Sequence, residues 1–373
     1  MTQLSETEKI DWLQLCRSGG VGPRTFFKLL DRFGTARRAW QELPRLMRDV
    51  GSQDRWQRCR REEAEAELAA LHALGCHLIA RGEPDYPARL AEIADPPPLL
   101  TVHGDPALLR EPGVAIVGAR NASANGRMLA RTLAKELTEA GLVVVSGLAR
   151  GIDTASHEGV LDAGGPTIAV IASGIDVPYP PDNQALMAQI ALTGAVVSER
   201  PPGAVPQARH FPRRNRMIAG LTLGVVVVEA APQSGSLITA RLAAEQGREV
   251  MAVPGSPLDP RHRGTNQLLR DGATLVESAA DICAALRIVP STPRPVRARP
   301  SLPPERPAEP RPPAPGDLLG RLQERLGVEP LLVDELIRQC HATSSEVQQA
   351  LLELELEGRI ERHPGNRVSL ASF

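Results

Sequence analysis

The most distinctive side chains of the sequence lie in one short segment, Arg209-His-Phe-Pro-Arg-Arg-Asn-Arg216. The segment holds four arginines, one histidine and one phenylalanine, and it contains no acidic residue. Guanidinium groups pair with phosphates whatever the base sequence, and an aromatic ring can stack on any base. Many basic clusters are only solvated faces. The aromatic ring among the arginines instead favours a surface that binds single-stranded nucleic acid.

Two further loops have the composition of anion sites. The segment Gly118-Ala-Arg-Asn-Ala-Ser-Ala-Asn-Gly126 lies between a predicted strand and a predicted helix, and Arg120 adds a charged donor. Ser234-Gly-Ser236 opens another helix, where free backbone N–H groups favour a phosphate. Several anion sites along one sheet edge suit a polyphosphate backbone better than one nucleotide. The dinucleotide fingerprint G-x-G-x-x-G is missing from the first loop.

Two loops leave alternatives open. Asp153 and His157 are four residues apart, which places them on one face of a helix. They can form a catalytic pair, or, as we favour, Asp153 braces the loop and His157 packs beneath it. Tyr179 lies in a loop rich in proline and glycine, where its ring either stacks on a base or fills a gap.

Alternating strands and helices must position these loops. Short apolar, β-branched runs alternate with segments that favour helices, and the runs occupy 114–117, 142–145, 167–171, 195–197, 225–228 and 249–253. Fully apolar strands of this kind imply a parallel sheet that is covered on both faces. We therefore predict an α/β fold with a Rossmann-like doubly wound domain over residues 79–289. Its ligand-binding loops follow the strands, along one edge of the sheet.

The flanking regions predict three further units. Residues 1–78 show helical spacing, and the turn Gly19-Gly-Val-Gly-Pro23 resembles that of a helix-hairpin-helix, although such a turn is also common in ordinary helical pairs. Residues 290–316 form a predicted linker, because 11 of the 26 residues 290–315 are proline. Residues 317–373 predict three helices and a β-ribbon, which is a winged helix.

The third helix of this winged helix is predicted over 344–357, with Ser344 and Ser345 as N-cap candidates. It carries four glutamates at 346, 353, 355 and 357. Carboxylates would face phosphates unfavourably, so a protein-binding or structural role is at least as well supported as duplex binding.

Composition excludes some classes of protein. The 373 residues include 43 basic and 44 acidic side chains, which argues against a uniformly basic, histone-like protein. Five scattered cysteines without a C-x-x-C pair predict neither a metal site nor a disulfide framework, and they fit a reducing cytoplasm. The polar N-terminus is unlike a signal peptide, and no apolar run approaches the ~20 residues of a membrane helix. We expect a cytoplasmic, multidomain protein.

Five motifs together resemble the DNA-processing protein A family, also called DprA or Smf. They agree in order and spacing, and they begin at Val114, Ser146, Phe211, Ser234 and Glu245. The resemblance implies a protein without catalytic activity and without a cofactor. It implies binding of single-stranded DNA, protection of incoming strands, loading of the recombinase RecA during natural transformation, and a homodimer formed through the Rossmann-like domain.

The resemblance also implies roles for individual residues. Arg120, in the loop that begins at Gly118, is expected to bind a phosphate, and Ser146 and Gly147 are expected to contact the strand. A platform for stacking and charge is expected from Phe211, Arg213, Arg214, Asn215 and Arg216. Gly235 and Ser236 are expected to complete the anion groove. The dimer contact is expected to involve Leu268 and Leu269.

A nucleotide-processing enzyme is the main alternative. Phosphoribohydrolases on a related Rossmann-like fold use a Pro-Gly-Gly-x-Gly-Thr-x-x-Glu loop. The matching stretch here runs from Pro232 to Thr239, and Thr239 takes the place of the glutamate. Without that carboxylate the loop can bind phosphate but lacks the acidic group for glycosidic cleavage. An oxidoreductase is disfavoured because the dinucleotide fingerprint is missing.

Overall fold

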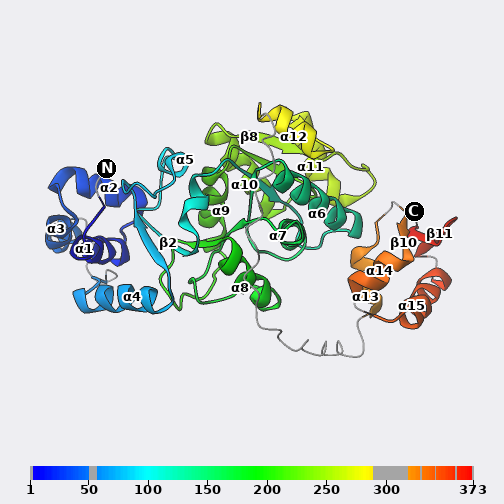
Figure 1. The fold of residues 1–373 in the computed structure, drawn as a ribbon, viewed down its shortest axis with the longest axis horizontal. Helices are drawn as coiled ribbons and strands as arrows, with labels where there is room; N and C mark the ends of the chain where they lie inside the picture. The colour runs from blue at the N-terminus through cyan, green and yellow to red at the C-terminus, as the bar shows by residue number, and fades with distance from the viewer. Residues whose placement is uncertain are drawn as a thin grey trace.

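The computed structural model describes residues 3–49, 57–288, 318–327, 330–340, 342–357 and 359–371. The predicted linker, residues 290–316, lies outside the described residues. A nine-stranded sheet forms the centre of the molecule, and helices lie on both of its faces (Figure 1). The predicted α/β class is confirmed. None of the helices in the described residues is both long and apolar enough to cross a bilayer.

The strand order of the sheet is β1-β2-β6-β5-β4-β3-β7-β8-β9. Its strands are β1 (His77–Ala80), β2 (Leu99–Gly104), β3 (Gly113–Val117), β4 (Val143–Ser146), β5 (Thr167–Val170), β6 (Ala195–Ser198), β7 (Gly224–Val227), β8 (Glu249–Ala252) and β9 (Thr274–Leu275). Strands β3 to β9 are parallel, whereas β1 and β2 pair antiparallel at one edge. The predicted doubly wound sheet is thus extended by an antiparallel pair that the sequence analysis did not foresee.

The order in which successive parallel strands are added to the sheet changes side at β3. Strands β4, β5 and β6 are added on one side of β3, and β7, β8 and β9 are added on the other. The topological switch point therefore lies between β3 and β7, where doubly wound folds usually bind their ligands.

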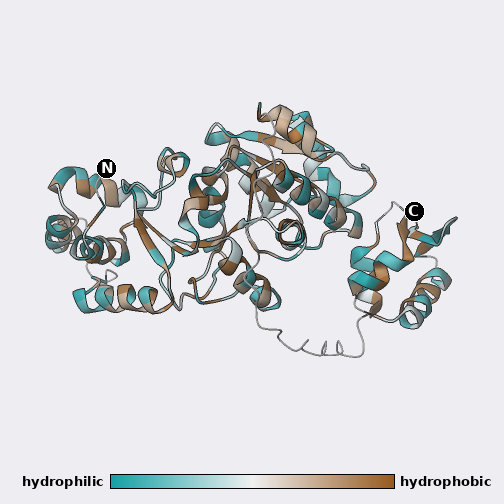
Figure 2. Ribbon diagram, viewed as in Figure 1, coloured by the Kyte–Doolittle hydropathy of each residue, from teal (hydrophilic) through white to brown (hydrophobic). Residues whose placement is uncertain are grey.

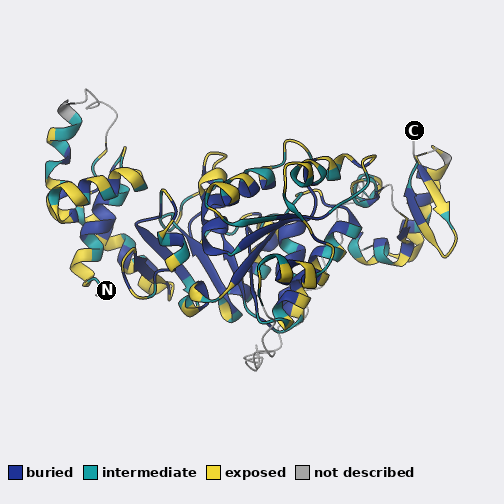
Figure 3. Ribbon diagram, turned by 90° about the horizontal axis from the view of Figure 1, so that it is seen from above, coloured by how far each residue is buried: buried dark blue, intermediate teal, exposed yellow. Residues whose placement is uncertain are grey.

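Side-chain alternation along each strand fills a core on both faces. Val114 and Ile116 of β3 belong to one buried cluster, and Ala115 and Val117 belong to another. Figure 2 shows hydrophobic colour along the central strands, and Figure 3 shows the same strands buried beneath partly exposed helices. The helices of the sheet domain are α5 (Ala88–Ala91), α6 (Ala124–Glu139), α7 (Ile152–Asp162), α8 (Gln184–Thr193), α9 (His210–Leu221), α10 (Gly235–Glu245), α11 (Arg263–Arg270) and α12 (Ala279–Ala285).

Four helices precede the sheet, and they lie beside β1 and β2 in Figure 1. They are α1 (Glu6–Arg17), α2 (Pro23–Phe33), α3 (Ala36–Asp49) and α4 (Arg61–Ala73). Their core around Trp12 and Phe26 is continuous with apolar side chains of β1 and α8. The guanidinium of Arg17 bonds Glu67 of α4 and donates to the carbonyl of Glu199, 3.2 Å away, which ties these helices to the sheet domain.

The C-terminal unit has three helices and a three-stranded sheet of order β10-β12-β11, as expected for a winged helix. Its elements are α13 (Leu318–Arg325), β10 (Leu331–Leu332), α14 (Val333–Cys340), α15 (Ser344–Leu356), β11 (Ile360–His363) and β12 (Arg367–Leu370). The N-cap of α15 is Thr343, and the expectation of Ser344 or Ser345 is wrong. Thr343 forms a capping box with Glu346, which satisfies two backbone donors at once.

Candidate nucleic-acid interface

The loops after β3, β4 and β5 and the first turn of α9 enclose a pocket of about 210 Å³. Arg120 comes from the first loop, Gly147 from the second and Tyr179 from the third. Phe211 and Arg214 come from α9. Residues that are far apart in the sequence therefore meet at the carboxyl edge of the sheet.

Two tilted aromatic rings and one guanidinium lie together at this pocket, and we call Tyr179, Phe211 and Arg120 the aromatic–arginine group. The ring centroids of Tyr179 and Phe211 are 5.7 Å apart, and the guanidinium carbon of Arg120 lies 5.1 Å from the Phe211 centroid. Tyr179 keeps 42% of its surface exposed. Its ring therefore forms an open wall of the pocket, where a flat ligand can stack on it.

Arg214 is buried beside this group. Its Nη1 donates to the carbonyl of Val170 at 3.0 Å. Burial lowers the pKa of Arg214 to about 10, while neighbouring Asp153 acts in the opposite direction, so the guanidinium remains charged at neutral pH. Burial raises the pKa of Asp153, whereas the charge of Arg214 opposes that shift. The pocket therefore has an arginine fixed in position before any ligand arrives.

The backbone at Gly147 leaves the space that this arginine needs. A Cβ atom at position 147 would overlap the Arg214 guanidinium and would lie 2.7 Å from Oδ2 of Asp153. The N–H of Gly147 donates to the same Oδ2 at 3.2 Å. Glycine is thus required here by a close approach of side chains.

Asp153 and His157 do not form a catalytic pair in this structure. The carboxylate of Asp153 accepts hydrogen bonds from Gly147 and Ala149, so it braces the loop after β4. His157 is fully buried, and its Nδ1 lies 2.8 Å from the hydroxyl of Thr167. Burial, with the charge of Arg214, lowers the pKa of His157 to about 3, which keeps the ring neutral at physiological pH.

The basic segment on α9 divides into exposed and buried arginines. Arg209 and Arg213 are exposed, whereas Arg216 is 4% exposed. Arg216 is ion-paired with Glu199 and Asp95, and it also donates to the backbone carbonyl of Asp95. The charge of Arg216 is therefore neutralised inside the protein.

Asn215, Ser146 and Gly118 of the predicted site are held by contacts within the fold. Asn215 is buried and donates from Nδ2 to the carbonyl of Gly235 at 3.3 Å. The hydroxyl of Ser146 is fully buried and donates to the carbonyl of Ile116 at 2.6 Å. A Cβ atom at Gly118 would lie 2.9 Å from Cβ of Ile152, so this glycine permits close packing of α7.

The start of α10 is more open. Gly235 is exposed, and a Cβ atom there would meet no other atom within 4 Å. Ser234 caps the helix, and its hydroxyl lies 2.7 Å from that of the buried Ser236. Thr239, which stands where the alternative enzyme class has a glutamate, is 2% exposed within α10.

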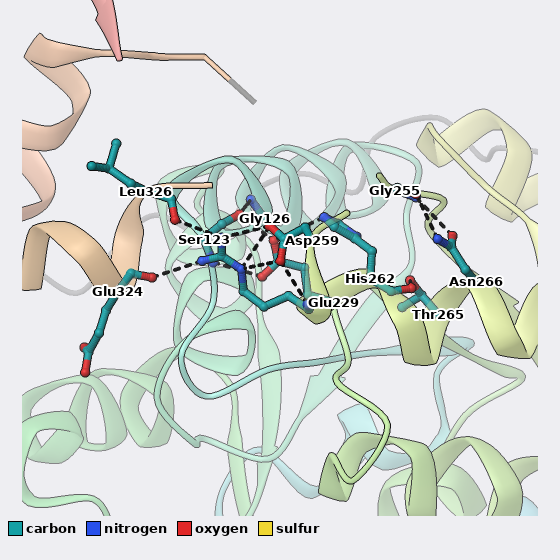
Figure 4. A network of polar contacts seen from close by, with 11 residues as sticks. Ser123, Gly126, Glu229, Gly255, Asp259, His262, Thr265, Asn266, Glu324 and Leu326 are labelled. Atoms are coloured by element: carbon teal, nitrogen blue, oxygen red, sulfur yellow. Dashed lines mark hydrogen bonds and ion pairs between the residues drawn. The ribbon is translucent and has the colours of Figure 1, made fainter. Parts of the chain in front are cut away.

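A carboxylate of the protein itself closes the switch point between β3 and β7 (Figure 4). Glu229 is 1% exposed, and it accepts hydrogen bonds from the N–H and the hydroxyl of Ser123. A Cβ atom at Gly126 would overlap this carboxylate. The positive end of the α6 dipole thus faces the carboxylate of Glu229. A phosphate of an external ligand would therefore be bound in this loop by Arg120.

The winged helix contacts the sheet domain next to this point (Figure 4). Asp259 holds the Arg261 guanidinium by accepting three hydrogen bonds of 3.0, 3.2 and 2.8 Å. The same guanidinium donates to the carbonyls of Glu324 and Leu326, at 3.0 and 2.8 Å. Ala124 packs in the core cluster of the winged helix. Arg261 therefore satisfies carbonyls at the C-terminal end of α13, which have no partner within that helix.

The two predicted dimer residues lie on α11. Leu268 and Leu269 are half-buried, and Leu268 also packs against the main core of the sheet domain. Leu268 lines a cavity of about 570 Å³, whose other apolar lining residues are Leu237, Pro232 and Pro257.

The sequence analysis missed some residues of the pocket. Arg150 and Asn121 both line it, and each lies in a loop that carries predicted site residues without having been assigned a role itself. Arg150 follows the Gly147 turn and forms an exposed ion pair with Asp182 at 3.3 Å. The position of Arg150 in the loop after the buried strand β4 is the sequence signal that could have identified it as a pocket residue. No group of three His, Cys, Asp or Glu side chains within the described ranges is arranged to hold a metal ion.

Comparison with protein-family models decides the relationship that the five motifs suggested. The model for DNA recombination-mediator protein A matches residues 77–287, which is more than half of the chain. This chain belongs to the DNA-processing protein A family. A model of the DprA-like N-terminal HHH domain matches residues 6–70, and one of the DprA winged helix domain matches residues 306–366.

Individual DprA relatives agree with this assignment. Protein Smf of Synechocystis is 32% identical over 98% of this chain and 99% of its own length. The X-ray structure of DprA from Streptococcus pneumoniae aligns with a TM-score of 0.63 and 36% identity, over 76% of this chain and 98% of that one.

A second solved structure concerns the binding of single-stranded DNA. It describes the single-stranded DNA binding mode of DprA from Helicobacter pylori. That chain is 30% identical to this one with a TM-score of 0.52, over 57% of this chain and 95% of its own.

Proposed function

We propose that this DprA-family protein binds single-stranded DNA at the pocket between the β3, β4 and β5 loops and α9, and that it mediates recombination without catalysing a reaction. The observation that carries the proposal is the aromatic–arginine group at the pocket. Phe211 and Tyr179 offer aromatic faces, while Arg120 and Arg214 offer positive charge on the same opening. Bases of any identity stack on such rings, and guanidinium groups pair with the phosphates between them.

The residues that line the pocket favour binding over catalysis. Within the described residues, that lining contains arginine, asparagine, aromatic, serine, proline, isoleucine and small side chains, and no carboxylate, imidazole or thiol. Ser173 of this lining donates its hydroxyl to the carbonyl of Val177 at 2.7 Å, and no carboxylate or imidazole of the described lining is present to activate a hydroxyl as a nucleophile. The nearby Asp153 is hydrogen-bonded to the loop backbone, and Thr239 is buried. A phosphoribohydrolase is therefore the weaker reading.

The roles that we assign to the predicted residues differ. Arg120, Arg213 and Gly235 are exposed, so we propose that they face phosphates of the strand. Gly147, Arg214 and Phe211 shape the pocket itself. We propose that the buried residues of the predicted set hold the platform in position together with the partly buried Gly118, and the buried ones are Ser146, Asn215, Arg216 and Ser236.

Family membership supports two further parts of the proposal. We propose that the protein hands its bound strand to the recombinase RecA in the cytoplasm. We also propose that two copies associate through the α11 surface that carries Leu268 and Leu269. Both leucines are half-buried, and Leu268 lines a cavity next to Leu237 and Pro257, which is the kind of partly apolar surface that a homodimer buries.

Binding of a fluorescent oligothymidine by single-residue variants tests the proposal. Arg120→Ala is expected to weaken binding and to flatten its dependence on salt. Phe211→Ala is expected to cost about 1–3 kcal/mol of binding free energy if the ring stacks on a base. Arg131→Ala is the matched control, because Arg131 is a half-exposed arginine of α6 that pairs with Glu158 and Asp162 outside the pocket. Equal affinities for Arg120→Ala, Arg131→Ala and the unchanged protein would refute the proposed site.

A further inference from the structure

A second groove lies on the other side of α9, between the sheet domain and the N-terminal helices. It consists of two adjoining cavities of about 560 and 340 Å³, which share Arg24, Ile93 and Ala94 in their walls. Arg213 of α9 lines the first cavity, and Lys28 of α2 lines the second. The groove therefore runs from the first turn of α9 to the first turns of α2.

This groove begins where the proposed DNA pocket ends. Phe211 lines the pocket, and the next two residues of the chain, Pro212 and Arg213, line the groove. A strand that leaves the rings of Tyr179 and Phe211 across the start of α9 thus meets the groove within two residues of the chain. The side chains at this crossing are basic, and burial together with the charges of Arg200, Arg209 and Arg213 lowers the pKa of His210.

The groove carries an excess of unpaired positive charge. Arg24, Lys28 and Arg213 have no ion-pair partner among the described residues. The acids nearby are mostly paired, since Asp95 pairs with Arg216, Glu92 with Arg248 at 3.5 Å, and Glu245 with Arg241 at 3.7 Å. Asp31 is the acidic residue of the walls that has no ion pair within the described part of the chain.

The far end of the groove repeats the chemistry of the pocket. The guanidinium carbon of Arg81 lies 4.7 Å from the ring centroid of Phe27, much as that of Arg120 lies 5.1 Å from the ring of Phe211. Phe27 and Arg81 both line the second cavity. An arginine over an aromatic ring, next to unpaired cations, is a surface on which a base can stack while its phosphates are neutralised.

We propose that the DNA strand bound at the pocket continues over Arg213 into this groove, and that Arg24 and Lys28 hold its phosphates there. The inference rests on the proposed function, and it adds a second subsite on the N-terminal helices. The ligand of the groove is then the same single strand that binds the pocket. Both the pocket and the far end of the groove combine a ring with unpaired cations, and the two cavities form one continuous groove. The N-terminal unit then lengthens the binding site of the sheet domain.

A length series of oligothymidines tests the second subsite with the full-length protein. A short strand of about 5 nucleotides is expected to fill the pocket alone, whereas one of about 16 nucleotides reaches the groove, within the range of known single-strand site sizes. The double variant Arg24→Ala/Lys28→Ala should bind the short strand like the unchanged protein. It should bind the long strand several-fold more weakly, and the slope of log K against log salt should fall by about 1.4, which is about 0.7 for each lost phosphate contact.

Arg37→Ala/Arg38→Ala provides the matched control. Both arginines are exposed on α3 of the same helical unit, and neither lines the groove, so the control removes the same net charge. An equal loss in the control and the test variant would overturn the subsite, because net charge alone would then explain it. An equal loss for short and long strands in the test variant would overturn it as well. Failure of the proposed function itself is distinguishable, since Arg120→Ala would then leave strands of both lengths unaffected.

Discussion

The guanidinium of Arg214 occupies the space in which a side chain at Gly147 would lie. The two residues are distant in the sequence, but α9 brings the arginine under the loop after β4, where Val170 and Asp153 fix it. The pocket therefore depends on a missing Cβ atom as much as on its charged groups.

Replacement of this glycine should disturb both the fold and the pocket. We expect Gly147→Ala to cost about 1–3 kcal/mol of unfolding free energy, because the added methyl group overlaps a buried guanidinium. Displacement of Arg214 should also weaken oligothymidine binding. Urea unfolding and anisotropy measure the two effects. Gly235→Ala is the control for stability, since its Cβ atom meets open space. A Gly147→Ala protein as stable as the control would contradict the close approach.

Two neighbouring arginines of α9 should separate stability from binding. Arg216→Ala leaves Glu199 without its buried partner, and such a loss costs about 3–5 kcal/mol of stability. Arg213→Ala removes an exposed charge, so the unfolding free energy should stay near that of the unchanged protein while strand affinity falls. Chemical denaturation and anisotropy on both variants test this contrast. The reverse pattern would mean that Arg216, and not Arg213, faces the ligand.

Acid should destabilise the protein through His157. Its pKa is lowered from 6.5 to about 3 on folding, so the unfolded chain binds a proton that the folded chain refuses between these pH values. Stability therefore falls as pH drops from about 6.5 towards 3, by up to about 1.4 kcal/mol per pH unit for one proton. The variant His157→Gln should lose this contribution. If the curves of unfolding free energy against pH were parallel for the two proteins, the predicted contribution of His157 would be refuted. The contribution of Asp153 is the same in both proteins, so it drops out of the comparison.

The winged helix should be released when its arginine contact is removed. Arg261→Ala deletes the donors to the carbonyls of Glu324 and Leu326. We expect the population with a detached winged helix to rise, which small-angle X-ray scattering reports as a larger radius of gyration. Arg241→Ala is the control, because this exposed arginine pairs with Glu245 on its own helix. Identical scattering from all three proteins would show that other contacts suffice.

Much of the fold was predictable because its central strands are buried on both faces. Such strands must be apolar along their whole length, and the six predicted runs correspond to β3 to β8. The antiparallel strands β1 and β2 escaped prediction. The strand His77–Ala80 begins at the end of the segment with helical spacing, and Leu99–Gly104 precedes the first of the six apolar runs. The pairing of these two strands depends on contacts between distant segments, which no local pattern shows.

The site was predictable as a set of loops but not residue by residue. Arg213 and Arg216 look alike in the sequence, yet one is exposed and the other is neutralised by acids 17 and 121 residues away. Nothing local distinguishes them, because the partners come from other elements. The hydroxyl of Ser146 and the carboxylate of Glu229 are likewise bound by groups from distant strands and loops.

Binding of the unchanged protein to oligothymidine and to a matched duplex, followed by anisotropy across a salt series, tests the central claim most directly. The account predicts a clear preference for the single strand. It also predicts that log K falls with log salt by about 0.7 for each phosphate neutralised. Equal or tighter binding of the duplex, or no binding of the single strand at low salt, would contradict the claim that the pocket between α9 and the sheet loops holds single-stranded DNA.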